Sequence, residues 1–265
     1  MSKLPSDKKF IDVSDYGRPF ARAFVSQVEH TKLTPVQVTY LFGLSGIFAI
    51  YAILNEYYFA AGFFLILKSI LDAADGELAR VKKTPSYTGR YLDSIFDIVL
   101  NFLLFITIWS VSSSSILATL VAFVSVQLQG TLYNYYYVVL RHNTAGGEQT
   151  SKIIEDKSPT ALPGESQRTV NWLFNTYNIL YGAFDKAIFN LDRNAVKTAP
   201  FPNWFMSIIS IYGLGFQLLI ISVMLTLGMI DFIIPFFIAY SILLLVFIGI
   251  RKIFLREVVS SKRFN

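Results

Sequence analysis

The sequence contains no cysteine and only two histidines among its 265 residues. Without cysteine, the chain has no disulfide framework and no thiolate ligands for a metal. Charged residues are also scarce, at 15% of the chain, whereas 54% of the residues are hydrophobic and the mean hydropathy is +0.50. A soluble domain of this length cannot bury so much apolar surface. The composition therefore predicts an integral membrane protein.

Long apolar runs divide the chain into six candidate membrane spans of about 20 residues each. Because these runs are long and continuously apolar, we expect α-helices and not the strands of a barrel. The predicted fold class is an all-α integral membrane protein with six transmembrane helices. The expected spans are Pro35–Leu54, Tyr58–Leu78, Tyr91–Val111, Ile116–Leu140, Phe205–Leu227 and Phe232–Ile253.

Lysine and arginine are missing from the connections on one side of this expected membrane domain. These connections are Asn55–Tyr57, Ser112–Ser115 and Gly228–Asp231. If both termini lie on the opposite side, every Lys and Arg except Lys68 falls on the side of the termini. The positive-inside rule then predicts that both termini, the Val81–Arg90 loop and the Arg141–Pro200 connection are cytoplasmic, or stromal or matrix in an organelle.

The net charge of +5 indicates attraction to anionic membrane lipids. Outside the expected spans, no basic patch is interleaved with stacking aromatic residues, so we do not expect nucleic acid as a partner. Residues 1–32 lack the apolar core of a cleavable signal peptide and are expected to stay with the mature protein. A membrane domain at 33–258 and a cytoplasmic tail at 259–265 complete the predicted organisation.

Two segments outside the spans are predicted to lie on the membrane surface as amphipathic helices. In residues 1–32, Phe20, Phe24 and Val28 recur at helical spacing. In the long connection 141–200, residues 143–168 are expected to form a solvated loop, and a second apolar stripe begins after it. Its members are Val170, Leu173, Phe174, Tyr177, Leu180, Tyr181, Phe184 and Ile188.

The fourth expected span carries polar and aromatic residues with more than one interpretation. Gln127 and Gln129 fit either a polar cavity lining or hydrogen bonds between helices. Four tyrosines near the inner end of the span predict an aromatic belt that anchors it at the membrane boundary. They are Tyr133, Tyr135, Tyr136 and Tyr137.

Four aspartates interrupt the apolar runs of the second and third expected spans. They are Asp72, Asp75, Asp93 and Asp97. One carboxylate at the centre of a spanning helix costs roughly 2.5–3.5 kcal/mol on insertion scales, so such a cluster is interpreted first as a functional site. The members of each pair are three or four residues apart and project from one helix face. A short cytoplasmic loop makes the two spans antiparallel neighbours, which brings the pairs together near the inner membrane boundary.

Four carboxylates in one pocket repel one another unless cations occupy the site. Ligation by oxygen alone favours a hard divalent ion, Mg²⁺ or Mn²⁺, and four carboxylates suffice to hold two ions. Two such ions a few ångströms apart are the usual apparatus for displacement at phosphorus, because they hold the attacking and the leaving oxygens. The aspartates therefore predict a two-metal site.

The residues between the aspartate pairs fit chemistry at a phosphate group. Gly76 and Ala79 leave the helix face open beside the acids, so a bulky phosphate ligand can approach the backbone. Arg80 supplies a planar fork of donors that suits phosphate oxygens. Gly89 is expected to break the loop just before the third span.

Together these residues form the pattern Asp72-x2-Asp75-Gly76-x2-Ala79-Arg80-x8-Gly89-x3-Asp93-x3-Asp97. This pattern resembles the complete signature of the CDP-alcohol phosphotransferases, also called CDP-alcohol phosphatidyltransferases, which are membrane enzymes of phospholipid head-group synthesis. The sequence Leu33-Thr34-Pro35, with Thr39 one turn on, also resembles the entry to the first helix of this family. A capping threonine before a proline is equally explained by ordinary helix physics.

The resemblance implies a transferase of substituted phosphate groups. In this reaction the hydroxyl of a small alcohol or a lipid attacks the β-phosphorus of a CDP-alcohol and expels CMP. Carried over residue by residue, Asp72, Asp75 and Asp93 ligate two Mg²⁺ or Mn²⁺ ions. Asp97 lies at the second metal and is the candidate general base. The CDP-alcohol site would be lined by Gly76, Ala79, Arg80 and Gly89, with Arg80 on the diphosphate.

Several alternatives remain open at this level. Lys68 either holds an acceptor phosphate or compensates the charge of a nearby aspartate such as Asp72. The donor is either CDP-diacylglycerol or a CDP-linked head group, and the stretch Asp75-Gly76-Glu77-Leu78-Ala79-Arg80 favours CDP-diacylglycerol. Family members are typically homodimers. The long 141–200 connection departs from the compact members of the family and leaves the acceptor open.

Two other function classes compete with this prediction. An intramembrane prenyltransferase also binds diphosphate through aspartates and Mg²⁺, but it places its two aspartate-rich motifs far apart in the chain. A cation or proton carrier also uses intramembrane acids. Such a carrier has no need of the Gly-Ala-Arg set beside them.

Overall fold

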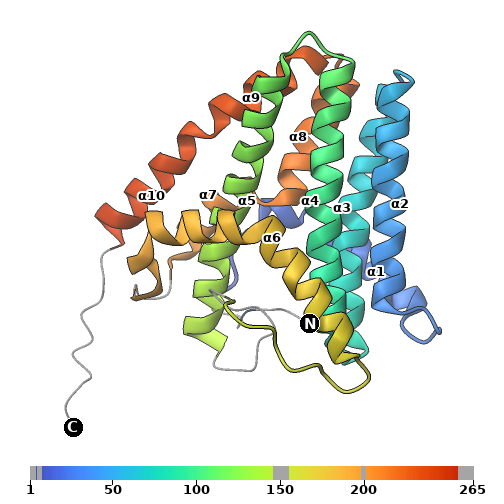
Figure 1. Cartoon of the computed structure of the whole chain (residues 1–265), viewed down its shortest axis with the longest axis vertical. Helices are drawn as coiled ribbons and strands as arrows, with labels where there is room; N and C mark the ends of the chain where they lie inside the picture. The colour runs from blue at the N-terminus through green and yellow to red at the C-terminus, as the bar shows by residue number, and fades with distance from the viewer. Residues whose placement is uncertain (1–3, 5–7, 146–154, 198–200, 256–265) are drawn as a thin grey trace.

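The computed structural model describes residue 4 and residues 8–145, 155–197 and 201–255. Over these residues the chain is helical and contains no strand (Figure 1). The elements are η2 (Val13–Asp15), α1 (Arg18–Val28), α2 (Pro35–Leu54), α3 (Tyr58–Val81), α4 (Tyr87–Ser110), α5 (Ile116–Ala145), α6 (Gln167–Leu191), η3 (Arg193–Lys197), α7 (Asn203–Ile209), η4 (Ser210–Tyr212), α8 (Leu214–Thr226), α9 (Ile230–Tyr240) and α10 (Ile242–Phe254). The all-α fold class is therefore confirmed for the part of the chain that is described.

Four of the helices described are long and apolar enough to cross a membrane, or five if one bent pair forms a single span. The four are Pro35–Leu54, Tyr87–Ser110, Ile116–Thr144 and Ile230–Phe254. The sequence predicts six. The missing one is α3, which has 24 residues but whose apolar run is interrupted by Lys68, Asp72 and Asp75. A sixth span at α3 and the orientation of the spans stay predictions.

The fifth expected span, Phe205–Leu227, is a broken helix. It divides into α7 with η4 and then α8, and the two parts are bent by 49°. The break falls at Gly213, whose backbone is extended, with φ −67° and ψ 146°. A Cβ at Gly213 would overlap the side chain of Ser14, and one at Gly215 would overlap the carbonyl oxygen of Ser14. The bend therefore marks the place where the η2 segment packs directly against the start of α8.

The loop between α3 and α4 is shorter than predicted. The sequence predicts a loop over Val81–Arg90, but α3 continues to Val81 and α4 already begins at Tyr87. Ser86 starts α4 because its hydroxyl accepts a hydrogen bond from the Gly89 N–H at 2.8 Å, which caps the helix. The apolar run of the expected span begins only after this polar first turn, so hydropathy alone does not show that the helix already starts at Tyr87.

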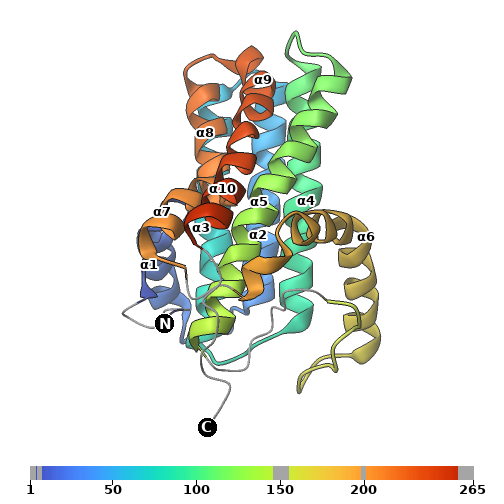
Figure 2. The same ribbon diagram turned by 90° about the vertical axis from the view of Figure 1, so that its left-hand side faces the viewer.

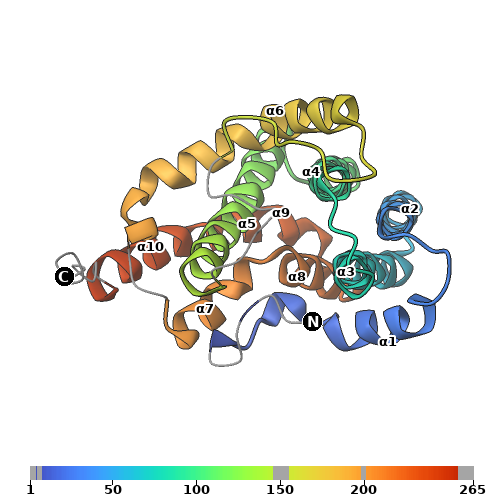
Figure 3. The same cartoon turned by 90° about the horizontal axis from the view of Figure 1, so that it is seen from below.

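Helix α2 packs against both α3 and α4, α8 packs against α3, and α9 packs against α5. Seen from below, α1 and α6 lie on opposite sides of this bundle (Figure 3). The view in Figure 2 shows the same separation. The two peripheral helices therefore flank the part of the bundle where α3 ends and α4 begins.

Buried glutamines join the helices in the apolar core. The Gln129 side-chain amide donates to the Phe237 carbonyl at 3.2 Å and to the Ser241 hydroxyl at 2.9 Å. Gln217 donates to Gln129 at 3.0 Å. Of the two interpretations of Gln129, hydrogen bonding between helices is the one that the structure shows.

The tyrosines of α5 do not form the predicted aromatic belt. Tyr135 and Tyr136 are buried, and their hydroxyls donate to the Asp192 carbonyl at 2.9 Å and to the Asp192 carboxylate at 2.7 Å. The same carboxylate is paired with Arg251 at the end of α10. Tyr133 donates to Asp12 at 2.5 Å. Buried hydroxyls need partners, so these rings serve internal contacts between segments distant in sequence.

Both predicted amphipathic helices are present as helices. In α6 the predicted stripe is largely buried through Val170, Leu173, Phe174 and Ile188, and Ile179 on another face is 81% exposed. In α1 the buried residues are Ala21 and Val25, with Phe24 and Val28 packed beside them, whereas Phe20 is 64% exposed. Their position at a membrane surface stays a prediction.

The connection before α6 is not simply a solvated loop. Residues 146–154 of it lie outside the described residues, but Glu165 accepts hydrogen bonds from the Ser86 hydroxyl and the Thr88 N–H, both at 2.7 Å. Glu155 is paired with Arg90 and accepts from the Tyr91 hydroxyl at 2.7 Å. Two acids of the connection thus hold the first turns of α4.

The hydrogen bonds of Glu165 predict a pH-dependent stabilisation. Burial opposes its charge, but the hydrogen bonds from Thr88 and Ser86 outweigh burial and lower the pKa of Glu165 below its ordinary value of 4.5. The stabilisation is therefore complete above pH 4.5 and is lost as the pH falls through the folded-state pKa. We expect Glu165→Gln to cost about 1–3 kcal/mol at neutral pH.

The measurement is the apparent midpoint of thermal unfolding in detergent micelles at pH 7 and at pH 3.5. Glu165→Gln should lower the midpoint at pH 7 and have a smaller effect at pH 3.5. Asp156→Asn removes one exposed acid from the same connection and serves as the control. An equal shift in both variants at pH 7 would contradict this role of Glu165.

Candidate functional site

The aspartate cluster forms where side chains from the second half of α3 meet side chains from the first half of α4, beside α2, which packs against both helices. Asp72, Asp75 and Asp93 each offer one carboxylate oxygen, and these oxygens all lie within 4.8 Å of one another. The structure therefore brings together three of the four aspartates that the sequence predicts, from two helices that are antiparallel neighbours. Three carboxylate oxygens this close to one another are compatible with a divalent cation held by oxygen ligands.

Asp75 is held in place by a residue of α2. The Thr39 hydroxyl donates to Asp75 Oδ2 at 2.6 Å, and both side chains are buried. Thr34 caps the start of α2 together with Gln37, which sets the register that points Thr39 at α3. The stretch from Leu33 to Thr39 thus has two separate roles, a helix cap and a support for Asp75.

Asp97 lies apart from the three clustered oxygens and is paired with Lys68. The Lys68 ammonium donates to Asp97 Oδ1 at 2.6 Å and also lies 4.9 Å from the centre of the Phe42 ring. Lys68 is 1% exposed. A buried ammonium needs a counter-charge, and this ion pair supplies it. Of the two interpretations of Lys68, the geometry supports charge compensation, with Asp97 and not Asp72 as the hydrogen-bonded partner.

The chemistry of the cluster fits a metal cation. Asp93 Oδ1 is buried and has no hydrogen-bond partner among the described residues. An orphaned carboxylate oxygen beside two further carboxylates is costly unless positive charge lies among them. Asp72, Asp75 and Asp93 would hold such an ion, and Asp97 can join them only through the oxygen that does not accept from Lys68.

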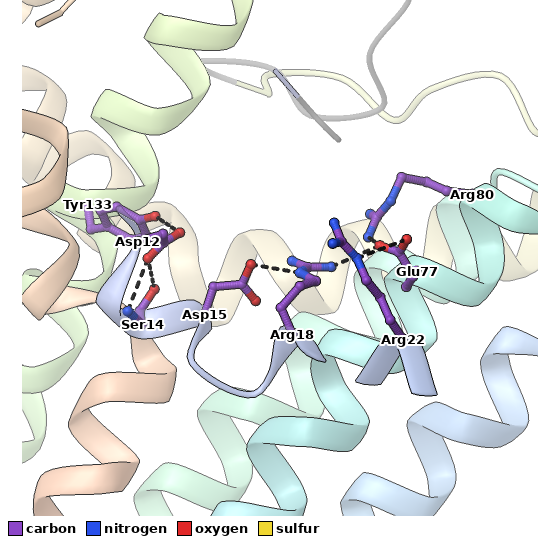
Figure 4. A network of polar contacts seen from close by, with 8 residues as sticks. All are labelled: Asp12, Ser14, Asp15, Arg18, Arg22, Glu77, Arg80 and Tyr133. Carbon is purple, nitrogen blue, oxygen red and sulfur yellow. Dashed lines mark hydrogen bonds and ion pairs between the residues drawn. The ribbon is translucent and has the colours of Figure 1, made fainter. Parts of the chain in front are cut away.

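The residues that follow Asp75 on α3 lead to a network of charges (Figure 4). Arg80 donates from Nη2 to Glu77 Oε2 at 2.7 Å. A Cβ on Gly76 would lie 3.4 Å from Arg80 Nη1, so the guanidinium lies over the glycine. The Ala79 carbonyl accepts from the Thr84 N–H at 2.9 Å and closes the end of α3. Gly76 and Arg80 thus lie together, as the pattern predicts.

Gly89 does not break the loop. It is the third residue of α4 and donates its N–H to the capping hydroxyl of Ser86. A Cβ at this position would lie 3.3 Å from Ser86 Oγ and 3.7 Å from Val36 of α2. The absence of a side chain therefore allows the cap and a close contact with α2.

Helix α6 packs against α4, the helix that carries Asp93 and Asp97. Burial and then the negative charge of Asp97 raise the pKa of the Tyr181 hydroxyl well above its ordinary value. The Tyr181 ring stacks on Tyr177 at 5.2 Å between centroids, and Tyr177 lies 5.4 Å from Tyr91 of α4. A row of aromatic rings thus lines the α4–α6 contact beside the site.

Sequence reasoning did not assign a site role to Glu77 or to Tyr181. Glu77 stands at an unspecified position of the pattern, among the charged residues at the end of α3, so the pattern alone does not single it out. Tyr181 belongs to an apolar stripe, and its place at the α4–α6 contact depends on tertiary packing. The contact between Thr39 and Asp75 gives no local sequence signal, because the two residues are 36 positions apart in the chain.

A comparison with protein-family models matches residues 32–162 to the CDP-alcohol phosphatidyltransferase family. The matched segment runs from the cap of α2 through α5 into the following connection and includes all four aspartates. No match is found among curated proteins or among solved structures. The family consists of transferases of phospholipid synthesis, and its typical dependence on divalent metals agrees with the carboxylate cluster. Residues 32–162 of the chain thus carry a CDP-alcohol phosphatidyltransferase domain.

Proposed function

We propose that the protein transfers a phosphoalcohol group from a CDP-alcohol to an acceptor hydroxyl and releases CMP, with two Mg²⁺ or Mn²⁺ ions at the aspartates. The observation that carries the proposal is the meeting of Asp72, Asp75 and Asp93 within a segment that matches the family. The donor we favour is CDP-diacylglycerol, and a small alcohol or a lipid supplies the hydroxyl. The carrier and prenyltransferase alternatives find no support in this match.

The reaction balances as one displacement at phosphorus. The acceptor oxygen forms a bond to the β-phosphorus, the bond from that phosphorus to the oxygen bridging the two phosphates breaks, and CMP leaves with the bridging oxygen. Bound divalent ions would supply positive charge for the attacking and leaving oxygens. The proton of the acceptor hydroxyl passes to a base in the site.

Asp97 is the base that we propose. It lies one helical turn beyond Asp93 on α4, and Lys68 is bound to only one of its oxygens. The ion pair keeps Asp97 oriented while its second oxygen is available for a proton. On the donor side, Arg80 binds the diphosphate, and Gly76, Ala79 and Gly89 let the nucleotide approach the helices.

The setting of the site is also proposed. We place both termini and the active site on the cytoplasmic side, because the basic residues gather there. We further propose six spans, with α3 as the second, and a homodimer as the assembly. Helix α6 of the 141–200 connection would form one wall of the acceptor side through Tyr181.

Removal of metal should abolish the activity. We expect EDTA to stop CMP release from CDP-diacylglycerol, and added Mg²⁺ or Mn²⁺ to restore it, because the buried carboxylates cannot bind a diphosphate without positive charge. Asp93→Asn should show the same loss without rescue, with Asp156→Asn as the control. The assay measures CMP with a panel of acceptors, and full turnover after chelation would refute the proposed metal site.

Asp97→Asn should separate binding from chemistry. The amide cannot take the acceptor proton, so we expect the transfer rate to fall by roughly 10²–10⁴-fold. CDP binding in the presence of Mg²⁺ should be largely kept, because Asp97 lies outside the three clustered oxygens. The two quantities are measured by CMP release and by equilibrium binding of CDP. Turnover at the wild-type rate would rule out Asp97 as the base.

Lys68→Met tests the two roles of that lysine. Because the variant leaves Asp97 without its counter-charge, we expect a loss of stability of about 3–5 kcal/mol with an unchanged acceptor KM. Lys68→Arg keeps the charge and should recover most of the stability. Thermal unfolding and acceptor titrations provide the measurements. A raised acceptor KM with unchanged stability would instead assign Lys68 to the acceptor site.

A further inference from the structure

A basic cleft lies one to two turns along α3 from the aspartates, between α1, α3 and the segment that leads to η2. It has a volume of ≈280 Å³. This volume is slightly below the lower end of the range for small-ligand pockets, about 300 Å³, and suits a ligand group of the size of a phosphate. Four basic residues line it: Lys9, Arg18, Arg22 and Arg80.

The packing of α1 on α3 creates this cleft. Ala21 and Val25 of α1 are buried against Ala74 and Leu78 of α3. Arg18 and Arg22 are one turn apart on α1 and both extend toward Glu77 on α3 (Figure 4). The N-terminal helix thus brings two guanidinium groups to the face where α3 presents Arg80.

A single carboxylate holds all three arginines. Glu77 Oε2 accepts from Arg80 at 2.7 Å and from Arg18 at 3.2 Å, and Glu77 Oε1 lies 3.8 Å from Arg22 Nε. The Glu77 side chain is 5% exposed. One buried negative charge among three positive charges leaves a local excess of positive charge, which favours an anion.

The other acids of the cleft are already engaged. Asp15 accepts from Arg18 Nε at 2.7 Å. Asp12 accepts from the Ser14 N–H at 3.1 Å and from the Tyr133 hydroxyl at 2.5 Å. Asp15 compensates Arg18 further, so the excess positive charge falls on Arg22, Arg80 and Lys9.

Arg22 and Arg80 have donors to spare. The Arg22 side chain is 59% exposed, and its contact with Glu77 is beyond hydrogen-bond length. Arg80 Nε is buried without a hydrogen-bond partner among the described residues. A guanidinium carries five N–H donors and is suited to two-point contacts with phosphate oxygens. Both residues therefore meet the chemical requirement for binding a phosphate.

We propose that Arg22 of α1 and Arg80 of α3 together bind a phosphate group of the cytidine nucleotide, with Glu77 as the positioning residue that holds the two guanidinium groups at the cleft. This inference rests on the proposed function. The link to the reaction is Arg80, whose guanidinium lies over Gly76, the residue directly after Asp75. The N-terminal helix thereby becomes part of the donor site.

The test is equilibrium binding of CDP with Mg²⁺ to the purified full chain in detergent. Arg22→Gln removes one guanidinium and should raise the Kd for CDP by roughly tenfold. Arg168→Gln removes one exposed arginine of α6 and should leave the Kd unchanged. Thermal unfolding of each variant is measured in parallel, and Arg22→Lys should recover part of the affinity.

Two results would overturn the inference. If Arg22→Gln lowers the unfolding midpoint and leaves the Kd for CDP unchanged, the charge network only fastens α1 to α3. If it leaves CDP binding unchanged but weakens binding to vesicles containing anionic phospholipid, the cleft takes a lipid head group. Failure of the proposed function is distinguishable, because the wild-type chain would then release no CMP from any CDP-alcohol.

Discussion

The repulsion among the acidic side chains that α3 and α4 direct toward one another is the constraint on which the rest of the structure depends. Asp72, Asp75 and Asp93 place carboxylate oxygens within 4.8 Å of one another in a largely apolar bundle. Such a group is stable only if neighbouring residues hold and compensate it. Thr39 from α2 and Lys68 from α3 do so on two sides, at 2.6 Å from Asp75 and Asp97 respectively. The remaining charge is left for a cation.

The surrounding segments hold α3 and α4, the two helices that carry the aspartates, from outside the bundle. On one side, α1 is joined to α3 through the arginines bound to Glu77. On the other, the connection before α6 holds the first turns of α4 through Glu155 and Glu165. Both attachments act on the segments that carry the aspartates. The periphery therefore supports the geometry of the site, although it lies outside the signature.

Much of the site could be predicted from the sequence, because its pattern is local. The spacing of Asp72, Asp75 and Asp93 on adjoining helices dictates their meeting, and periodicity gives α6. The start of α4 was misplaced because Ser86 caps a polar turn that hydropathy does not register. The tyrosines of α5 were misjudged because their partner, Asp192, is far away in sequence. Contacts between distant residues carry no local signal.

The η2 segment packs directly against the start of α8, and this close packing restricts which residues the two segments can contain. Ser14 lies so close to both glycines that a methyl group at Gly213 would collide with its side chain, and one at Gly215 would collide with its carbonyl oxygen. The two glycines can accept larger residues only if the N-terminal segment takes another course. Position 14 and positions 213 and 215 are thus expected to change together, so that an exchange of either segment between relatives succeeds only when both are transplanted.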